Sequence, residues 1–170
     1  MSSETLNAAS IAQYDHASGA AWTNPNNAIG DDAAVATHTV SVVTSDWLAG
    51  IVTDTIPDGE PITGFAARFK HLYTPDGPSA SSGEISIVKN GAIVGTAKST
   101  GAWSESTAWS SVFGGSSDLW GTSGTGTDVW GVAVWADGEK YDEFAVAAFE
   151  LTIYYGSGSS SGSFMMFFVP

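Results

Sequence analysis

The stretch Ala145-Val-Ala-Ala-Phe-Glu-Leu-Thr-Ile-Tyr-Tyr155 decides the fold class, because apolar residues recur in it at every second position. Side chains two residues apart point to the same face of a β-strand. One face of this segment is therefore apolar and consists of Ala147, Phe149, Leu151, Ile153 and Tyr155. The opposite face carries Glu150, Thr152 and Tyr154. We expect a strand that covers a hydrophobic core with one face.

Seven further segments have a strand-like composition, with β-branched and aromatic residues in short runs: 33–43, 48–53, 62–73, 84–89, 92–98, 106–113 and 129–135. Apolar residues at helical spacing are hard to find. A chain of 170 residues is long enough to bury a single core. About eight strands predict one all-β domain, an antiparallel β-sandwich of jelly-roll-like type.

Turn residues divide this domain further. Asn90-Gly91 separates two apolar runs and tolerates positive φ, which predicts the type I′ turn of a tight hairpin. Residues 114–126 are rich in Gly, Ser and Thr, and predict a long loop that Trp120 anchors. We place the sandwich at 21–155. Residues 1–20 are expected to form an extended arm with one short helix around 8–14.

The segment 156–170 consists of a Gly/Ser tether followed by an apolar tail. The tail carries no charge and contains the residues that we expect to bind a partner: Phe164, Met165, Met166, Phe167, Phe168 and Val169. Such a cluster is unfavourable in water, so it should be buried. We expect it to dock on another subunit, as an added strand or in a groove. The alternative is a final strand on its own sandwich.

The charge of the chain excludes several partners. Eighteen acidic residues against five basic ones give a formal net charge of −13, which repels nucleic acid and anionic membrane surfaces. There is no cysteine, so disulfides and thiolate chemistry are excluded. Residues 1–19 lack the basic and apolar regions of a secretory signal, and no segment reaches the length of a membrane-spanning helix. We therefore expect a soluble protein made in a cytoplasm.

Catalytic and metal-binding patterns are weak. No nucleophile elbow or zincin-type motif is present, and His16, His38 and His71 are scattered. Acidic neighbours occur at 31–32, 137–139 and 142–143, which raises a glycosidase pair or an oxygen-ligand calcium site as alternatives. Acidic residues in Gly-rich turns are more often solvated loop residues. We therefore expect no enzyme and no required cofactor, with calcium as the one open alternative.

Seven tryptophans are many for a domain of this length. Most should fill the core or plug loops, but exposed rings can stack on sugars or on partner proteins. Trp103, Trp109 and Trp120 are the possible aromatic contacts.

Several short motifs resemble those of a known group of proteins. They are the segment 22–28 (WTNPNNA) followed by Asp31-Asp32, the segment 89–91 (KNG), and the segment 115–121 (GSSDLWG) before 128–131 (DVWG). These motifs are similar to segments of β-sandwich proteins from tailed-bacteriophage particles, and the resemblance covers about 21–155. The resemblance implies a virion structural protein with a jelly-roll-like domain: a capsid decoration (cement) protein, a head fibre or a tail appendage. It implies no catalytic residues.

The expected function is therefore that of a capsid decoration protein located in the virion. It would bind neighbouring capsid subunits, with the major capsid protein as partner, and would form a homo-oligomer. The alternative is a carbohydrate-binding or receptor-binding module of a head or tail appendage. A carboxylate-pair hydrolase is the third possibility.

Overall fold

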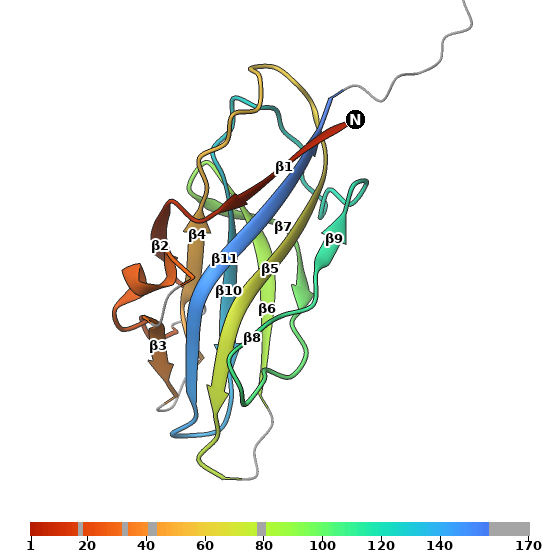
Figure 1. Ribbon diagram of the computed structural model, residues 1–170. Coiled ribbons are helices and arrows are strands. Elements are labelled where there is room, and N and C mark those ends of the chain that lie inside the picture. The colour runs from red at the N-terminus through yellow and green to blue at the C-terminus, as the bar shows by residue number, and fades with distance from the viewer. Residues whose placement is uncertain (17–18, 32–33, 41–43, 78–80, 157–170) are drawn as a thin grey trace, which may run out of the picture.

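The computed structural model describes residues 1–16, 19–31, 34–40, 44–77 and 81–156. In these residues the chain forms two antiparallel β-sheets that pack face to face (Figure 1). The fold is therefore all-β, and the expected β-sandwich is confirmed. The helical element of the described chain is one 3-10 turn, η1 (Pro25–Ala28).

The front sheet is built around two long strands, β5 (Ile62–Thr74) and β11 (Glu143–Tyr155), in the order β1-β11-β5-β8. In addition, β3 pairs with β11, and β9 pairs with β5. The shorter strands of this sheet are β1 (Ser2–Asn7), β3 (Ala36–Thr39), β8 (Ala108–Trp109) and β9 (Phe113–Gly115).

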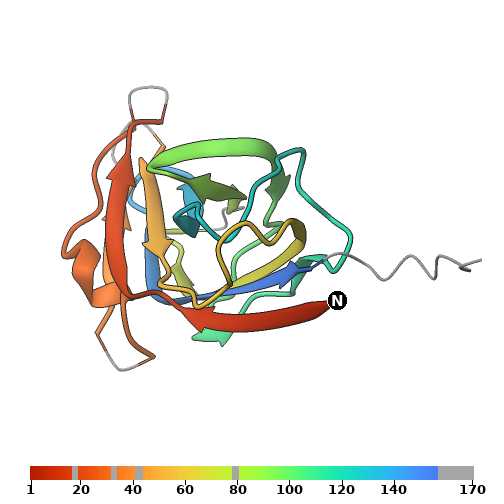
Figure 2. The same ribbon diagram turned by 90° about the horizontal axis from the view of Figure 1, so that it is seen from above.

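The back sheet has five strands in the order β2-β4-β10-β6-β7. They are β2 (Ser10–Tyr14), β4 (Trp47–Ile51), β10 (Trp130–Asp137), β6 (Ser82–Lys89) and β7 (Ala92–Ser99). Seen from above, the two sheets face each other (Figure 2). Buried side chains from both sheets form one continuous core. Its largest buried side chains include Phe65, Phe69 and Phe149 from the front sheet and Trp130 from the back sheet.

The period-two alternation of β11 holds from Phe149 to Ile153, whose inward side chains are fully buried in the core. The register with β5 shifts between Val146 and Ala148, as at a β-bulge. Before the shift the core side chains are Phe144 and Val146, so the alternation changes phase there. The expectation that Ala147 belongs to the same core-facing set was wrong, because this residue lies within the bulge.

The N-terminal segment differs most from expectation. The short helix expected around residues 8–14 is wrong, since β2 (Ser10–Tyr14) occupies this position. The chain passes from the front sheet to the back sheet at Ala8 and Ala9, whose amides donate to the carbonyls of Phe149 and Ile51. Residues 1–20 thus contribute one strand to each sheet. Gly50 makes the crossing possible, because a Cβ there would lie within 3 Å of Phe149 and Ala8.

Two local expectations are confirmed. Asn90 and Gly91 both have positive φ, at 49° and 79°, as the type I′ turn between β6 and β7 requires. The loop after β9 is anchored by Trp120, which is 2% exposed and donates its indole N–H to the carbonyl of Phe65 at 3.2 Å.

One buried carboxylate stabilises the end of the sandwich at which the β10–β11 turn lies. Asp142 is fully buried and accepts hydrogen bonds from the hydroxyl of Tyr73 and from the amides of Asp76 and Glu139. It therefore ties the turn between β10 and β11 to the loop that follows β5. Hydrogen bonds to a carboxylate offset the free-energy cost of burying it.

His71 makes the fold sensitive to acid. Burial against Phe69 and Trp103 lowers its pKa from 6.5 to about 4. Because the folded pKa lies below the unfolded one, the neutral imidazole contributes fully above pH 6.5, and the contribution is lost as the pH falls toward 4.

Between about pH 7 and pH 4 the wild type should lose about 2–3 kcal/mol more unfolding free energy than His71→Gln. Urea denaturation at both pH values measures this, and parallel losses would contradict it.

Candidate functional site

Two of the acidic residues singled out in the sequence, Asp31 and Asp142, have partners within the protein. Asp31 pairs with Lys70 on the surface at 2.5 Å, and Asp142 is saturated by the donors described above. Among the described residues, no group of three or more His, Asp and Glu side chains has the arrangement of a metal site. His38 is 3% exposed, and burial lowers its pKa. It packs near Trp22, as a core residue does.

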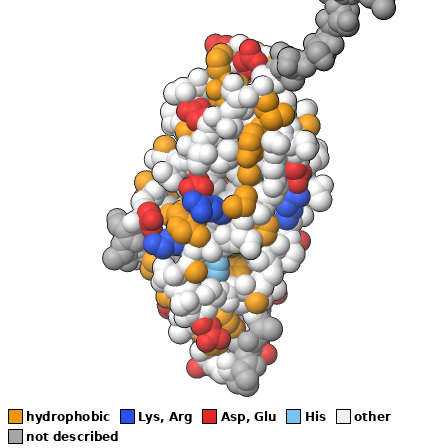
Figure 3. All heavy atoms as spheres, turned by 45° about the vertical axis from the view of Figure 1, so that its right-hand side comes forward, with side chains coloured by type: hydrophobic (Ala, Val, Ile, Leu, Met, Phe, Trp, Pro, Cys, Tyr) orange, Lys and Arg blue, Asp and Glu red, His pale blue; other side chains and the backbone are white. Residues whose placement is uncertain are grey.

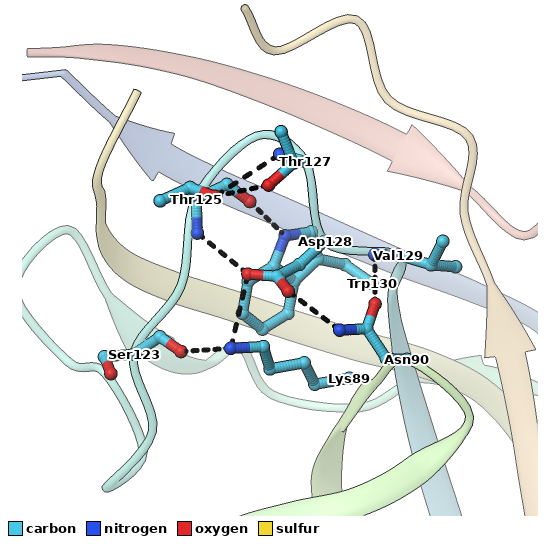
Figure 4. Close-up of polar contacts among 8 residues, drawn as sticks. All are labelled: Lys89, Asn90, Ser123, Thr125, Thr127, Asp128, Val129 and Trp130. Carbon is cyan, nitrogen blue, oxygen red and sulfur yellow. Dashed lines mark hydrogen bonds and ion pairs between the residues drawn. The ribbon is translucent and has the colours of Figure 1, made fainter. Parts of the chain in front are cut away.

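A denser polar cluster surrounds Asp128, just before β10 (Figure 4). Its carboxylate accepts hydrogen bonds from the side-chain amide of Asn90 at 2.8 Å and from the backbone amide of Thr125 at 2.9 Å. Lys89 lies 3.2 Å from the same carboxylate and donates to the carbonyl of Ser123 at 2.7 Å. Burial opposes ionisation of Asp128, but these hydrogen bonds and the ammonium group outweigh it and lower the pKa of the carboxyl.

The cluster around Asp128 connects the β6–β7 turn to the loop before β10. The carbonyl of the Asn90 side chain accepts a hydrogen bond from Val129 N, so the β6–β7 turn is fixed to the start of β10. The indole N–H of Trp130 donates to the carbonyl of Thr125. Each polar atom of Asp128 and Asn90 is thus directed at another part of the protein, and the cluster holds the loop before β10 in place.

Most of the tryptophan side chains are buried. Trp103 and Trp120, expected as possible contacts, are 4% and 2% exposed and therefore fill the core. Trp109 is partly exposed, but the guanidinium of Arg68 lies 4.5 Å from its ring centroid. Trp135 is also partly exposed and stacks on His16 at 4.2 Å. One ring face of each accessible tryptophan is therefore already covered.

The outer face of the back sheet carries a second hydrophobic cluster, separate from the core. Its buried members are Trp47, Ala49, Val88 and Ala133, and the partly buried residues against it are Ala12, Tyr14, Ile51, Ile93, Ala97 and Trp135. These residues come from all five strands of the sheet. We call this surface the outer apolar face.

The strand register arranges the outer apolar face in three rows. The middle row consists of small residues that pair across four strands: Ala12, Ala49, Ala133 and Ser86. An aromatic row lies on one side of it and contains Tyr14, Trp47 and Trp135. The other side is mainly aliphatic and contains Ile51, Gly131, Val88 and Ile93. Ala49 and Ala133 are fully buried, so the larger side chains on both sides of the middle row cover them.

The chemistry of this face suits recognition of apolar surface. Glu84 is the charged residue of the aromatic row, and its carboxylate accepts a hydrogen bond from the indole of Trp135 at 3.1 Å. Partial burial raises the pKa of Tyr14 above its ordinary value, so its phenol stays neutral. Sequence reasoning did not identify the face. Its signal is the uninterrupted apolar run 130–136, which indicates a strand covered on both sides.

The expected partner-binding residues Phe164, Met165, Met166, Phe167, Phe168 and Val169 lie outside the described residues. The last described residue, Gly156, follows β11 at the end of the sandwich where β1 begins, since Ser2 pairs with Tyr155. The tether therefore starts beside the first strand.

The role of Asp128 can be tested by stability measurements. Asp128→Ala removes two hydrogen bonds and one ion pair from a side chain that is 17% exposed, so the unfolding free energy should fall by about 1–2 kcal/mol. Asp31→Ala is the matched control, because the Asp31 side chain is 53% exposed and its ion pair with Lys70 should contribute almost nothing. Urea denaturation of both variants at neutral pH checks this. Equal losses would contradict the structural role of the cluster.

Helical structure in the described chain is too short to cross a lipid bilayer. No known protein family matches the sequence, and no curated protein is similar to it. The outer apolar face is thus the surface feature from which a function can best be proposed.

Proposed function

We propose that this protein is a non-enzymatic structural module that binds other protein surfaces through its outer apolar face. In its specific form the proposal is a capsid decoration protein of a tailed bacteriophage, bound to the major capsid protein in the virion. The observation that carries the proposal is the apolar cluster on the outward side of the back sheet.

An outward sheet face of this composition is unusual for an isolated sandwich. Antiparallel sheets commonly have one face on the core and polar side chains on the other. Here Ile51, Ile93 and Trp135 are directed outward and remain partly exposed. The centres of protein interfaces are enriched in aromatic residues and depleted in charge, as this face is. Covering it with another protein would remove apolar area from water, at about 25 cal/mol per Å² before the costs of association.

The charge distribution supports a partner that is less acidic than the protein itself. Of the five basic residues, Arg68, Lys70, Lys89 and Lys98 form ion pairs with acidic side chains. The basic groups visible in Figure 3 accordingly lie beside acidic ones. The fifth, Lys140, lies over the ring of Tyr141. The unpaired charge is thus almost entirely negative, which favours a partner with a basic rim and discourages non-specific clustering.

The virion assignment rests on the short motifs at 22–28, 89–91 and 115–121, which are similar to segments of phage β-sandwich proteins, and on the physics of repeated binding. A moderate contact becomes effective when symmetry repeats it many times over a shell. The carbohydrate-binding alternative has less support, because Arg68 and His16 cover one ring face each of Trp109 and Trp135.

The proposal can be tested with particles of the phage that encodes the chain, prepared without this protein. Purified wild-type protein should bind them. Ile93→Glu places a charge on the outer apolar face and should weaken binding at least about tenfold, or about 1.4 kcal/mol. Co-sedimentation and cryo-electron microscopy of the decorated particles measure occupancy.

Val112→Glu is the matched control, because Val112 is 61% exposed, lies outside the face and should leave binding unchanged. Ala97→Glu provides a second variant on the face if Ile93→Glu lowers stability. Thermal unfolding confirms that each variant is folded. Failure of the wild type to bind, or equal binding by all variants, would overturn the proposal.

A further inference from the structure

The four edges of the two sheets differ in how they are protected. An exposed edge strand offers unpaired backbone N–H and C=O groups to any other extended chain, so proteins usually shorten, cover or bend their edges. Three of the edges here follow that rule. The fourth, β1, does not.

The protected edges use three different means. At β7, the amide of Thr96 donates to the carbonyl of Trp120 at 2.6 Å, so the loop after β9 covers the strand. Beside β2, the side chain of Gln13 accepts a hydrogen bond from Trp22 N, which brings the segment before η1 against this edge. Beyond β5, the strands β8 and β9 have only two and three residues.

The edge at β1 is long and regular. All six residues, Ser2 to Asn7, pair in continuous register with β11 on one side. On the other side, these residues make no backbone hydrogen bond with the described part of the chain. The strand contains no proline and no bulge. Its one charged side chain, Glu4, accepts hydrogen bonds from the amide and hydroxyl of Thr55 and is thereby occupied.

We propose that the outer edge of β1 accepts residues 164–169 of a second copy of the chain as an added strand. The acceptor and the donor each have six residues. Phe, Met and Val are compatible with extended backbone, and the donor segment carries no charge, so it can approach a protein of net charge −13 without repulsion. The proposal concerns a different surface from the outer apolar face and does not depend on it.

The position of Gly156 favours exchange between copies over closure within one chain. Antiparallel pairing is slightly more stable than parallel pairing. To run antiparallel to β1, the donor must begin beside Asn7, which is five residues and about 17 Å from Ser2 along the strand. Eight Cα–Cα steps lead from Gly156 to Phe164 and span at most about 28 Å, so the same chain would have to spend more than half of this length on returning to the Asn7 end. The segment of a second copy can approach in this direction without such a restriction.

The chain contains no cysteine, so disulfide trapping can map the contact directly. Thr5→Cys, on an exposed position of β1, is mixed with single-cysteine variants at each position from 164 to 169 under mild oxidation. Adjacent strands bring directly opposed Cβ atoms to about 5 Å, and successive side chains point to opposite faces. Cross-links between copies should therefore form at alternate donor positions, at least about tenfold faster than with a Val112→Cys control.

Two further measurements complete the test. Sedimentation velocity should show concentration-dependent association of the unmodified chain and its loss when residues 157–170 are removed. Chains that carry both Thr5→Cys and one donor cysteine distinguish closure within a copy from exchange, because closure leaves the mass unchanged. Cross-linking within single copies only, at all six positions equally, or no faster than the Val112→Cys control would overturn the proposal. The particle-binding result for Ile93→Glu has no bearing on these outcomes.

Discussion

The pairing of β5 with β11 is the interaction on which the rest of the structure depends. These strands have 13 residues each and pair along almost their whole length. Every other strand of the front sheet pairs with one of them. Their inward side chains, among them Phe65, Phe69 and Phe149, meet Trp130 and Val132 of the back sheet in the core. A break in this pair would remove the surface on which the back sheet packs.

Sequence reasoning predicted the parts of this structure that local patterns determine. β11 and β5 follow from apolar alternation, and the β6–β7 hairpin follows from Asn90-Gly91, because only residues that tolerate positive φ fit its turn. β1 and β2 could not be predicted in this way. Ser2 to Asn7 contains one large apolar side chain, Leu6, so its strand conformation comes from pairing with β11, more than 140 residues away.

The candidate site was even less accessible to sequence reasoning. The alternating pattern of a strand identifies the residues that face the core, but it does not assign a role to an apolar residue on the opposite side. The strand register pairs Ala133 with Ala49, and only this pairing shows that both belong to the outer apolar face. Asp142 was similarly hidden, since nothing in its sequence context distinguishes a fully buried carboxylate from the solvated acid expected in a Gly-containing turn.

The crossing of the chain at Ala8 and Ala9 has a consequence for how the molecule forms. β1 pairs with β11, while β2 pairs with β4, so the N-terminal strands join the two sheets through contacts of very different sequence separation. During synthesis, β2 can meet its partner early, whereas β1 must wait until residues 143–155 have left the ribosome. Folding dominated by such distant contacts is slow. The front sheet therefore cannot be completed before β11 is available, and until then one edge of β5 lacks its hydrogen-bonding partner.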